Sequence, residues 1–282
     1  MYSQIFETRG IAELASFIER HARVLVLTGA GMSTASGIPD YRDRDGVRRG
    51  KAPIQGPEFR TSDAVRKRYW ARSMVGWPVL AQARPNPGHR ALAALEAEGR
   101  IAALVTQNVD GLHRHAGSNS LVELHGNIHL VACLECGARI SREFMQELLE
   151  EANPHMANAS AMPAPDGDAH LEPEYLEDFH VPHCPHCAGM LMPDVVFFGD
   201  GVPRARTEQV NRQLERADAV LVVGSSLMVF SGYRLCRDAA VSGKPVAAVN
   251  MGKTRADHLL SLKVEERSEY ALPLLAALLS SG

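Results

Sequence analysis

The sequence contains no apolar run long enough to cross a bilayer. Its best candidate, AVLVVGSSLMVF (219–230), is interrupted by Gly-Ser-Ser, whereas a membrane-spanning helix needs about 20 apolar residues. The N-terminal segment MYSQIFETRGIAELASFIERHA lacks the apolar core of a signal peptide, and its glutamates disfavour a transit peptide. We therefore expect no membrane association and a cytoplasmic location, or the mitochondrial matrix for a processed eukaryotic chain.

A strong charge of either sign is also missing. The formal net charge of the 282 residues is −3, and 22% of them are charged. A surface that binds nucleic acid broadly usually has a clear excess of lysine and arginine, so we expect no direct nucleic acid binding. With 45% hydrophobic residues, the chain can bury a large core, and one large domain with a smaller module is expected.

Cysteine is scarce, and its placement is uneven. Four of the five cysteines form two Cys-x-x-Cys pairs, CLEC (133–136) and CPHC (184–187). In a chain without an export signal, such pairs favour metal binding over disulfides. The fifth cysteine, Cys236, lies in the apolar helical stretch YRLCRDAAV. There we expect a buried small side chain rather than a nucleophile.

The two pairs predict one zinc site, whose ligands are Cys133, Cys136, Cys184 and Cys187. Four thiolates complete a tetrahedron and leave no open position for a substrate, so the predicted role of the Zn²⁺ is structural. Two alternatives stay open: a redox role for either pair, and replacement of a thiolate by the flanking His183 or His186.

Short runs of Val, Ala and Leu alternate with helical patterns along most of the chain. The predicted strands are VLVLT (24–28), IAALVTQN (101–108), DVVFFG (194–199), AVLVVGSS (219–226) and KPVAAVN (244–250). Helical patterns occupy 11–22, 60–83, 85–99, 142–153, 203–217, 231–242 and 269–279. The pattern over 60–83 is expected to break near Gly76-Trp77-Pro78. Continuous apolar strands alternating with helices predict an α/β fold, a Rossmann-like doubly wound parallel sheet covered on both faces.

The composition changes between about 130 and 190. There the cysteine pairs enclose a helical segment and a stretch rich in Pro, Ala and Asp. We interpret 131–189 as a smaller zinc-binding module with an inserted loop around APDGD (164–168). Residues 1–130 and 190–282 are then the two parts of a discontinuous Rossmann-like domain.

Four predicted strands run into polar or glycine-rich segments, namely TGAG (28–31), TQNVDG (106–111), GSS (224–226) and NMG (250–252). Doubly wound sheets bind ligands beyond the carboxyl ends of their strands, so these segments are expected to form one site. A strand followed by GAG suggests a dinucleotide. However, the common fingerprint would place a third glycine at Thr34, and the next glycine is Gly37. The loop is longer and more polar than that fingerprint requires.

A histidine on a loop beside these strand ends is a candidate general base, because it titrates near neutral pH. His113 and His115 lie in TQNVDGLHRHAG, and His125 lies in ELHGN. Hydrophobic periodicity does not choose among the three.

The segments GAGMSTASGIPDYR, TQNVDGLHRHAG, ELHGN, MPDVVFFGD, VVGSSLMVFSG and VN, with the two cysteine pairs, occur in an order and at separations that resemble the sirtuins. The resemblance extends from about residue 10 to 275. The stretches PIQ, RYWARSMVGWP, APDGD and SGYR are similar to a mitochondrial subgroup of the class II branch.

This resemblance implies an enzyme that consumes NAD as a co-substrate. It would transfer an acyl group from the lysine side chain of a protein or peptide to ADP-ribose, releasing nicotinamide and 2′-O-acyl-ADP-ribose. Mono-ADP-ribosyl transfer or NAD hydrolysis in the same pocket is the alternative. A non-catalytic NAD sensor or a zinc-based interaction module is less favoured, because ELHGN is intact.

The motif positions imply roles for individual residues. His125 takes the position of the general base, and Asn108 and Asp110 those of the nicotinamide pocket. The residues implied to bind NAD are Gly29, Ala30, Gly31, Ser33, Ser36, Ile38, Pro39, Asp40, Tyr41, Arg42, Gln107, Asn108, Val109, Asp110, Gly224, Ser225, Ser226, Asn250, Met251, Gly252 and Ser268.

Two groups are implied for the substrate. Val196, Phe197, Phe198 and Gly199 would form one side of a cleft that receives the peptide as an added strand, and SGY (231–233) would form the other. Tyr69 and Arg72, three apart in a helical pattern, superficially match a pair that holds carboxylated acyl chains in another class II sirtuin. The alternative for this pair is a solvated helix face or an arginine paired inside the protein.

Overall fold

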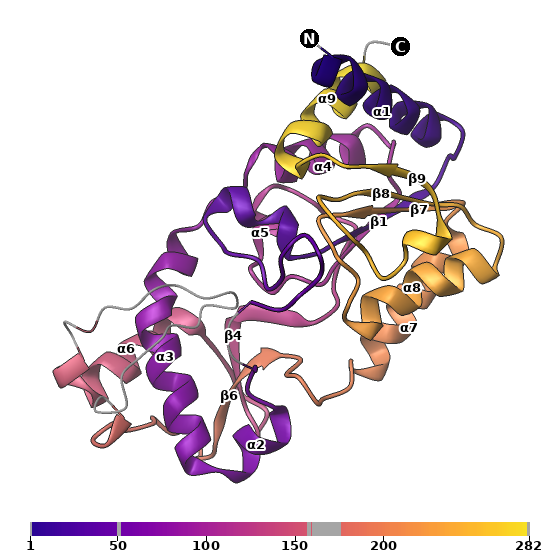
Figure 1. Ribbon diagram of the computed structural model, residues 1–282. Helices are drawn as coiled ribbons and strands as arrows, with labels where there is room; N and C mark the ends of the chain where they lie inside the picture. Colours follow the sequence, from indigo (N-terminus) through magenta and orange to yellow (C-terminus); the bar gives the residue numbers. More distant parts are fainter. Residues whose placement is uncertain (1, 50–51, 157–158, 160–175, 281–282) are drawn as a thin grey trace.

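The computed structural model describes residues 2–49, 52–156, 159 and 176–280, and it divides into a larger and a smaller unit (Figure 1). The larger unit is built on six strands: β1 (Val24–Thr28), β2 (Ala103–Thr106), β3 (Leu121–Glu123), β7 (Ala219–Val223), β8 (Val246–Val249) and β9 (Leu260–Val264). Their order is β3-β2-β1-β7-β8-β9, and every neighbouring pair is parallel. The predicted Rossmann-like parallel sheet is confirmed.

Helices cover both faces of this sheet, which is why its central strands are almost entirely apolar. All residues of β1, β2, β7 and β8 are buried. Val24 and Val26 point into one core cluster together with residues of α1 (Tyr2–Glu19), α4 (Pro87–Ala97) and α9 (Ser268–Ser280). Leu25 and Leu27 point into the opposite cluster, with α7 (Arg204–Arg216) and α8 (Phe230–Val241). Alternation along a strand thus fills two cores at once.

The smaller unit contains an antiparallel sheet in the order β5-β4-β6. Its strands are β4 (Gly126–Cys133), β5 (Arg139–Ser141) and β6 (Leu191–Val195). The expectation that 194–199 forms a strand of the parallel sheet is wrong. Instead, β6 pairs antiparallel with β4, for example Met192 with Ala132. The chain leaves the strand after Val195, so an apolar run alone did not identify the sheet or the register.

Two helices that come earlier in the sequence pack on this smaller sheet, α2 (Gly56–Thr61) and α3 (Asp63–Gln82). Trp70 of α3 is fully buried in one core cluster with Met145 of α6 (Arg142–Ala152) and Phe179. We therefore propose that 56–82 belongs with the smaller unit in addition to 131–189. The boundaries of the two domains stay a prediction.

The predicted break of the helix at Gly76-Trp77-Pro78 is wrong, because α3 continues through Pro78 to Gln82. Proline cannot donate a bond to the carbonyl four residues earlier, that of Met74. Here the side chain of Gln146 donates to that carbonyl at 3.0 Å. A donor from α6 therefore compensates for the missing helical bond.

The helix predicted over 85–99 is confirmed as α4, and its ends follow local rules. The side chain of Asn86 accepts bonds from the backbone amides of Gly88 and His89, and Pro87 is the first helical residue. Gly99 has a φ of 72°, the left-handed conformation that ends many helices.

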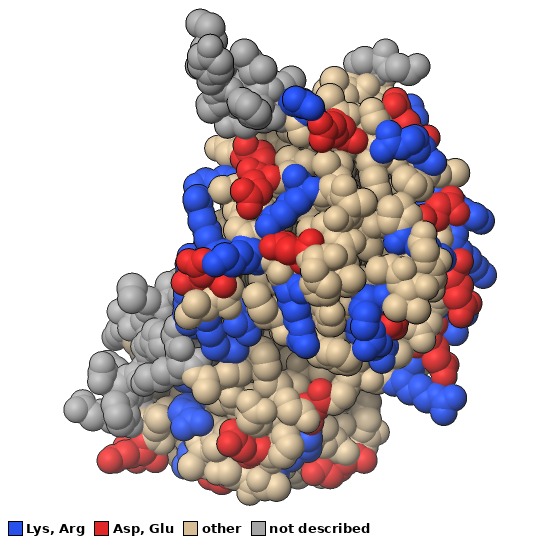
Figure 2. All heavy atoms as spheres, turned by 45° about the vertical axis from the view of Figure 1, so that its right-hand side comes forward, with Lys and Arg blue, Asp and Glu red and all other residues tan. Residues whose placement is uncertain are grey.

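No helix in the described ranges is long and apolar enough to span a membrane. On the face drawn in Figure 2, basic and acidic side chains are intermixed, in keeping with the small net charge of −3. The inserted loop around APDGD lies outside the described residues.

Candidate functional site

The four polar segments predicted to meet at one edge of the sheet do meet there. The strands β2, β1, β7 and β8 are adjacent and parallel, so their carboxyl ends lie side by side. A cavity of about 680 Å³ opens at this edge and extends toward the smaller unit. Residues from all four segments line it.

Most residues expected to bind NAD line this cavity. They are Gly29, Ala30, Gly31, Ser33, Ile38, Pro39, Asp40, Tyr41, Arg42, Gln107, Asn108, Val109, Asp110, Gly224, Ser225, Ser226, Asn250 and Met251. Three others lie outside its lining. Ser36 accepts a bond from Asn86, Gly252 packs against the backbone of Arg44, and Ser268 is buried at the start of α9.

The GAG and GSS loops interlock. The amide of Gly29 donates to the carbonyl of Val223 at 3.1 Å, and that of Gly31 donates to the carbonyl of Gly224 at 2.8 Å. A Cβ on Gly31 would lie 2.9 Å from the Gly224 oxygen, and one on Gly29 would lie 2.7 Å from the Ser225 side chain. A side chain at either glycine would clash with the GSS loop. The contact between the two loops therefore requires both glycines, independently of any ligand.

A buried polar network joins the first two loops. The hydroxyl of Ser33 donates to Asp110 Oδ2 at 2.6 Å, and Asn108 Nδ2 donates to that hydroxyl at 3.0 Å. Asn108 Nδ2 also donates to the Gly29 carbonyl at 3.0 Å. The amide group of Asn108 is therefore fixed in orientation, with its nitrogen committed to the GAG loop.

Asp110 is buried, with 6% of the residue's surface exposed. Burial raises its pKa above the ordinary value, although the bonds from Ser33 and from the amide of Leu112 act in the opposite direction. An ionised Asp110 is therefore costly here, because few polar groups replace the water it has lost.

His125 stands at the turn between β3 and β4, with both ring nitrogens bonded. Nδ1 lies 2.9 Å from the carbonyl oxygen of Gln107, and Nε2 lies 2.8 Å from the Ser231 hydroxyl. Burial lowers the pKa of His125; the bond to Gln107 opposes this shift, and the nearby Arg206 adds to it. The ring is therefore biased toward the neutral form that a general base requires.

Of the three candidate histidines, the cavity lining contains His125 but neither of the others. His113 is 1% exposed and bonds the Thr28 hydroxyl at 2.9 Å. Its ring lies 4.7 Å from that of the fully buried His89. His115 instead stacks edge-on against His129.

The expected substrate residues divide in a similar way. Val196, Phe197, Phe198, Gly199 and Tyr69 line the cavity. The ring of Tyr69 packs 5.3 Å from those of Phe59 and Phe197. Arg72, one turn along α3, is partly buried and is not among the lining residues.

Sequence reasoning missed Arg48 and Arg60 at this site, and it placed Ser231 on a wall of the substrate cleft without predicting its contact with His125. Ser231 contacts His125, and Arg48 lies over the Phe198 ring at 5.1 Å. Arg60 forms a two-point bond with Asp200. The contacts of Ser231 and Arg60 join residues more than 100 positions apart, and no local pattern reports such contacts.

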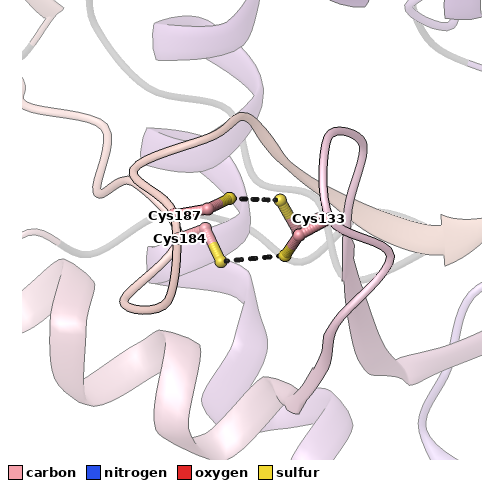
Figure 3. A group of neighbouring side chains, drawn as sticks. Cys133, Cys184 and Cys187 are labelled. Carbon is pink, nitrogen blue, oxygen red and sulfur yellow. Dashed lines mark hydrogen bonds between the residues drawn. The ribbon is translucent and has the colours of Figure 1, made fainter.

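The four paired cysteines form a cluster in the smaller unit (Figure 3). Their Sγ atoms all lie within 4.8 Å of one another. Cys133 and Cys187 are 3.5 Å apart, and Cys136 and Cys184 are 3.8 Å apart. A tetrahedral zinc thiolate site, with Zn–S bonds of about 2.3 Å, has S–S edges of about 3.8 Å. The donor set and its spacing therefore fit one Zn²⁺.

Cys236 lies apart from this cluster, fully buried in the core beneath α8. Burial raises the pKa of its thiol to about 12. It is therefore a small core side chain and a poor nucleophile, as the sequence predicted.

The fold and site define a Rossmann-like α/β protein with a large cavity at the strand ends and a cysteine cluster suited to zinc. The chain belongs to the Sir2 family, whose signature matches residues 29–231. It is 54% identical to an NAD-dependent protein deacetylase of Xanthomonas axonopodis pv. citri, over 94% of this chain and 90% of that one. It is 53% identical to NAD-dependent protein deacetylase 3 of Pseudomonas syringae pv. tomato, over 89% and 90% of the two chains.

Solved Sir2 structures share the fold. A structure described as a basis for the mechanism and regulation of Sir2 enzymes superposes with a TM-score of 0.76, at 28% identity over 97% of this chain and 98% of that one. A Sir2 complex with a p53 peptide and NAD superposes with a TM-score of 0.72, at 28% identity over 95% and 96% of the two chains.

Proposed function

We propose that the protein removes acyl groups from lysine side chains of proteins in an NAD-dependent reaction that releases nicotinamide and 2′-O-acyl-ADP-ribose. The observation that carries this is the placement of His125. Its imidazole lines the same cavity as the four strand-end segments and as the strand-like segment 196–199. Relatives at 53–54% identity are named NAD-dependent protein deacetylases.

His125 acts as the general base in this proposal. The Gln107 carbonyl can only accept a hydrogen bond, so the ring proton resides on Nδ1 and Nε2 keeps its lone pair. Nε2 then takes a proton from a ribose hydroxyl of NAD. Since burial lowers the pKa of His125, its ring is neutral and ready to accept that proton near pH 7.

Asn108 and Asp110 hold the nicotinamide end of NAD in this proposal, and Ser33 orients both of them. The dinucleotide extends along the interlocked GAG and GSS loops toward Ser225, Ser226 and Asn250. Gln107 Nε2 donates to Ser225 Oγ at 2.8 Å, and the Gln107 carbonyl accepts from the ring of His125. Gln107 therefore connects the ribose end of the site to the base.

The acylated peptide lies beside 196–199 as an added strand. The amide of Val196 donates to the carbonyl of His125 at 2.8 Å, so a main-chain hydrogen bond joins the peptide-binding segment directly to His125, the base. The acyl-lysine side chain then points toward the cavity, where Tyr69 and Phe197 supply an apolar wall.

Tyr69 and Arg72 are proposed to admit acidic or bulky acyl groups. Tyr69 lines the cavity, which supports a direct contact between its side chain and the acyl group. Arg72 is not among the lining residues, so its guanidinium would have to reach the acyl group past the residues that line the cavity. Turnover of succinyl- or glutaryl-lysine that falls in Arg72→Ala, with acetyl-lysine turnover unchanged, would support the pair. Equal loss for all acyl groups would contradict it.

The cysteine cluster is proposed to hold one Zn²⁺, which cross-links the two knuckles of the smaller unit. All four sulfurs would be used, so the ion supplies folding energy to that unit and no step of the reaction. The deacetylases of Xanthomonas and Pseudomonas to which the chain is similar are bacterial proteins. We propose that this protein is located in the cytoplasm.

The test is a panel of acylated lysine peptides incubated with the protein, with and without NAD, and analysed by mass spectrometry. We expect peptide deacylation, nicotinamide and 2′-O-acyl-ADP-ribose in equal amounts. His125→Tyr should lower the rate by about 100-fold to 10,000-fold. Protein-bound ADP-ribose, or free ADP-ribose without deacylation, would instead establish the transferase or hydrolase alternative.

A further inference from the structure

The base is contacted from the opposite side of the cavity by the serine of the SGYR stretch (231–234). Ser231 is the second residue of α8, and His125 directly precedes β4. The Ser231 hydroxyl lies 2.8 Å from Nε2 of His125. Both side chains line the cavity.

The direction of this hydrogen bond follows from the other nitrogen of the ring. Nδ1 faces the Gln107 carbonyl at 2.9 Å, and a carbonyl oxygen has no proton to donate. In the neutral ring the proton therefore lies on Nδ1. Nε2 is then an acceptor, and the hydroxyl of Ser231 donates to it.

The start of α8 is held in this place by its backbone. A Cβ on Gly232 would lie 2.4 Å from Oε1 of Gln107, so the start of α8 packs directly on the Gln107 side chain. The same Gln107 side chain bonds Ser225 at 2.8 Å. Gln107 and Ser231 thus hold the imidazole at both nitrogens from two elements that pack directly together.

We propose that Ser231 is a positioning residue for the base: its hydroxyl holds Nε2 of His125 in the free enzyme and yields that nitrogen to the ribose hydroxyl of NAD. This inference rests on the proposed function. In the free enzyme the serine donates to neutral Nε2. During the reaction the ribose O–H bond breaks and the lone pair of Nε2 forms the new Nε2–H bond.

The charged groups on this side of the cavity lie on α7, on β6 and on α8, the helix that carries Ser231. Arg206 of α7 acts on the ring and lies 3.5 Å from Asp194 of β6. Arg234 and Asp238 of α8 line the same cavity. Because Ser231 donates to the neutral form, it favours that form together with burial and Arg206. Its removal should therefore make the ring easier to protonate.

The experiment compares wild type with Ser231→Ala and Ser231→Thr. The pKa of His125 is measured in the free enzyme by NMR of ¹³C-labelled histidine, with the signal assigned from His125→Ala. We expect Ser231→Ala to raise that pKa by about half a unit or more and Ser231→Thr to preserve it. The acidic limb of the kcat/KM profile for an acylated peptide should move to higher pH in parallel.

Ser261→Ala is the matched control, since it removes a serine hydrogen bond to the Val246 carbonyl at the opposite end of the sheet. It should leave the pKa of His125 unchanged. A Ser231→Ala variant that is folded and has the wild-type pKa for His125 would overturn the inference. A shifted pKa in a protein without NAD-dependent deacylation would uphold the contact and overturn the proposed function instead.

Discussion

Arg60 and Asp200 form a two-point ion pair, in which Nη1 and Nη2 of the guanidinium lie 2.9 and 2.6 Å from the two carboxylate oxygens. Arg60 belongs to α2, and Asp200 follows the segment proposed to bind the peptide. The amide of Gly56 also donates to the carbonyl of Phe198 at 2.8 Å. The pair thus fastens α2 to the end of the substrate cleft.

Replacing Arg60 with alanine should loosen that cleft edge. Both partners are partly exposed, so the effect on global stability should be below about 1 kcal/mol. We expect KM for an acylated peptide to rise about twofold to fivefold while KM for NAD changes less. Steady-state kinetics with each substrate varied in turn would measure the difference.

Arg23→Ala is the appropriate comparison, because Arg23 pairs with Asp218 at 2.7 Å near the other ends of β1 and β7. It should leave both KM values unchanged. An Arg60→Ala enzyme with wild-type KM for every peptide would show that the ion pair has no part in substrate binding.

Asp110→Asn should separate stability from activity. The pKa of Asp110 is raised by burial, so at neutral pH its ionised form costs folding free energy, and that cost disappears when the charge is removed. We expect the free energy of unfolding in urea to stay equal or increase. The value of kcat/KM for NAD should fall by about 10-fold to 100-fold. A variant that loses stability and keeps activity would contradict the assignment.

Acid should destabilise the fold through its buried histidines. Burial lowers the pKa of His89 to about 4 from 6.5 and lowers that of His113 as well. Between pH 6.5 and 4 the unfolded chain binds more protons than the folded one, so the free energy of unfolding decreases as the pH is lowered. The contribution of the neutral histidines to stability is fully present above pH 6.5. His89 alone should account for about 3 kcal/mol across that window.

Urea unfolding at a series of pH values would measure this dependence. A His89→Gln variant should be less sensitive to pH than wild type over the same window, whatever its absolute stability. Identical pH slopes for the two proteins would show that His89 is protonated equally in the folded and unfolded states.

Elemental analysis of the purified protein should find one zinc per chain. Cys136→Ser should lose the metal and lower the Tm, because a site of three thiolates holds zinc more weakly and the smaller unit depends on it. Cys236→Ala provides the control, since Cys236 lies in the core beneath α8 and outside the cluster. Full zinc content in Cys136→Ser would contradict the proposed ligand set.

The sequence predicted best those features that local composition determines. The strands β1, β2, β7 and β8, apolar except for the last residue of β1 and of β2, were recognised because burial on both faces leaves few polar positions. Their polar ends located the cavity, and the spacing of the cysteine pairs located the cluster. The short edge strands β3 and β9 were missed, since three or five half-buried residues give little signal.

Other features depend on partners distant in the sequence. The helix α3 passes through Pro78 because Gln146 replaces the missing donor. The strand β6 belongs to the smaller sheet because β4 is its neighbour. Ser231 reaches His125 across 106 positions. Such contacts are decided by tertiary packing, which periodicity along one segment does not report.

The main chain of His125 is bonded to the segment proposed to bind the peptide, because the His125 carbonyl accepts from the amide of Val196 at 2.8 Å. A peptide that pairs with 196–199 as an added strand would therefore have its position relative to the His125 imidazole fixed by main-chain hydrogen bonds alone. Selection among client proteins would then depend on whether an acylated lysine can be offered from an extended, accessible stretch, and only weakly on the identity of the neighbouring amino acids.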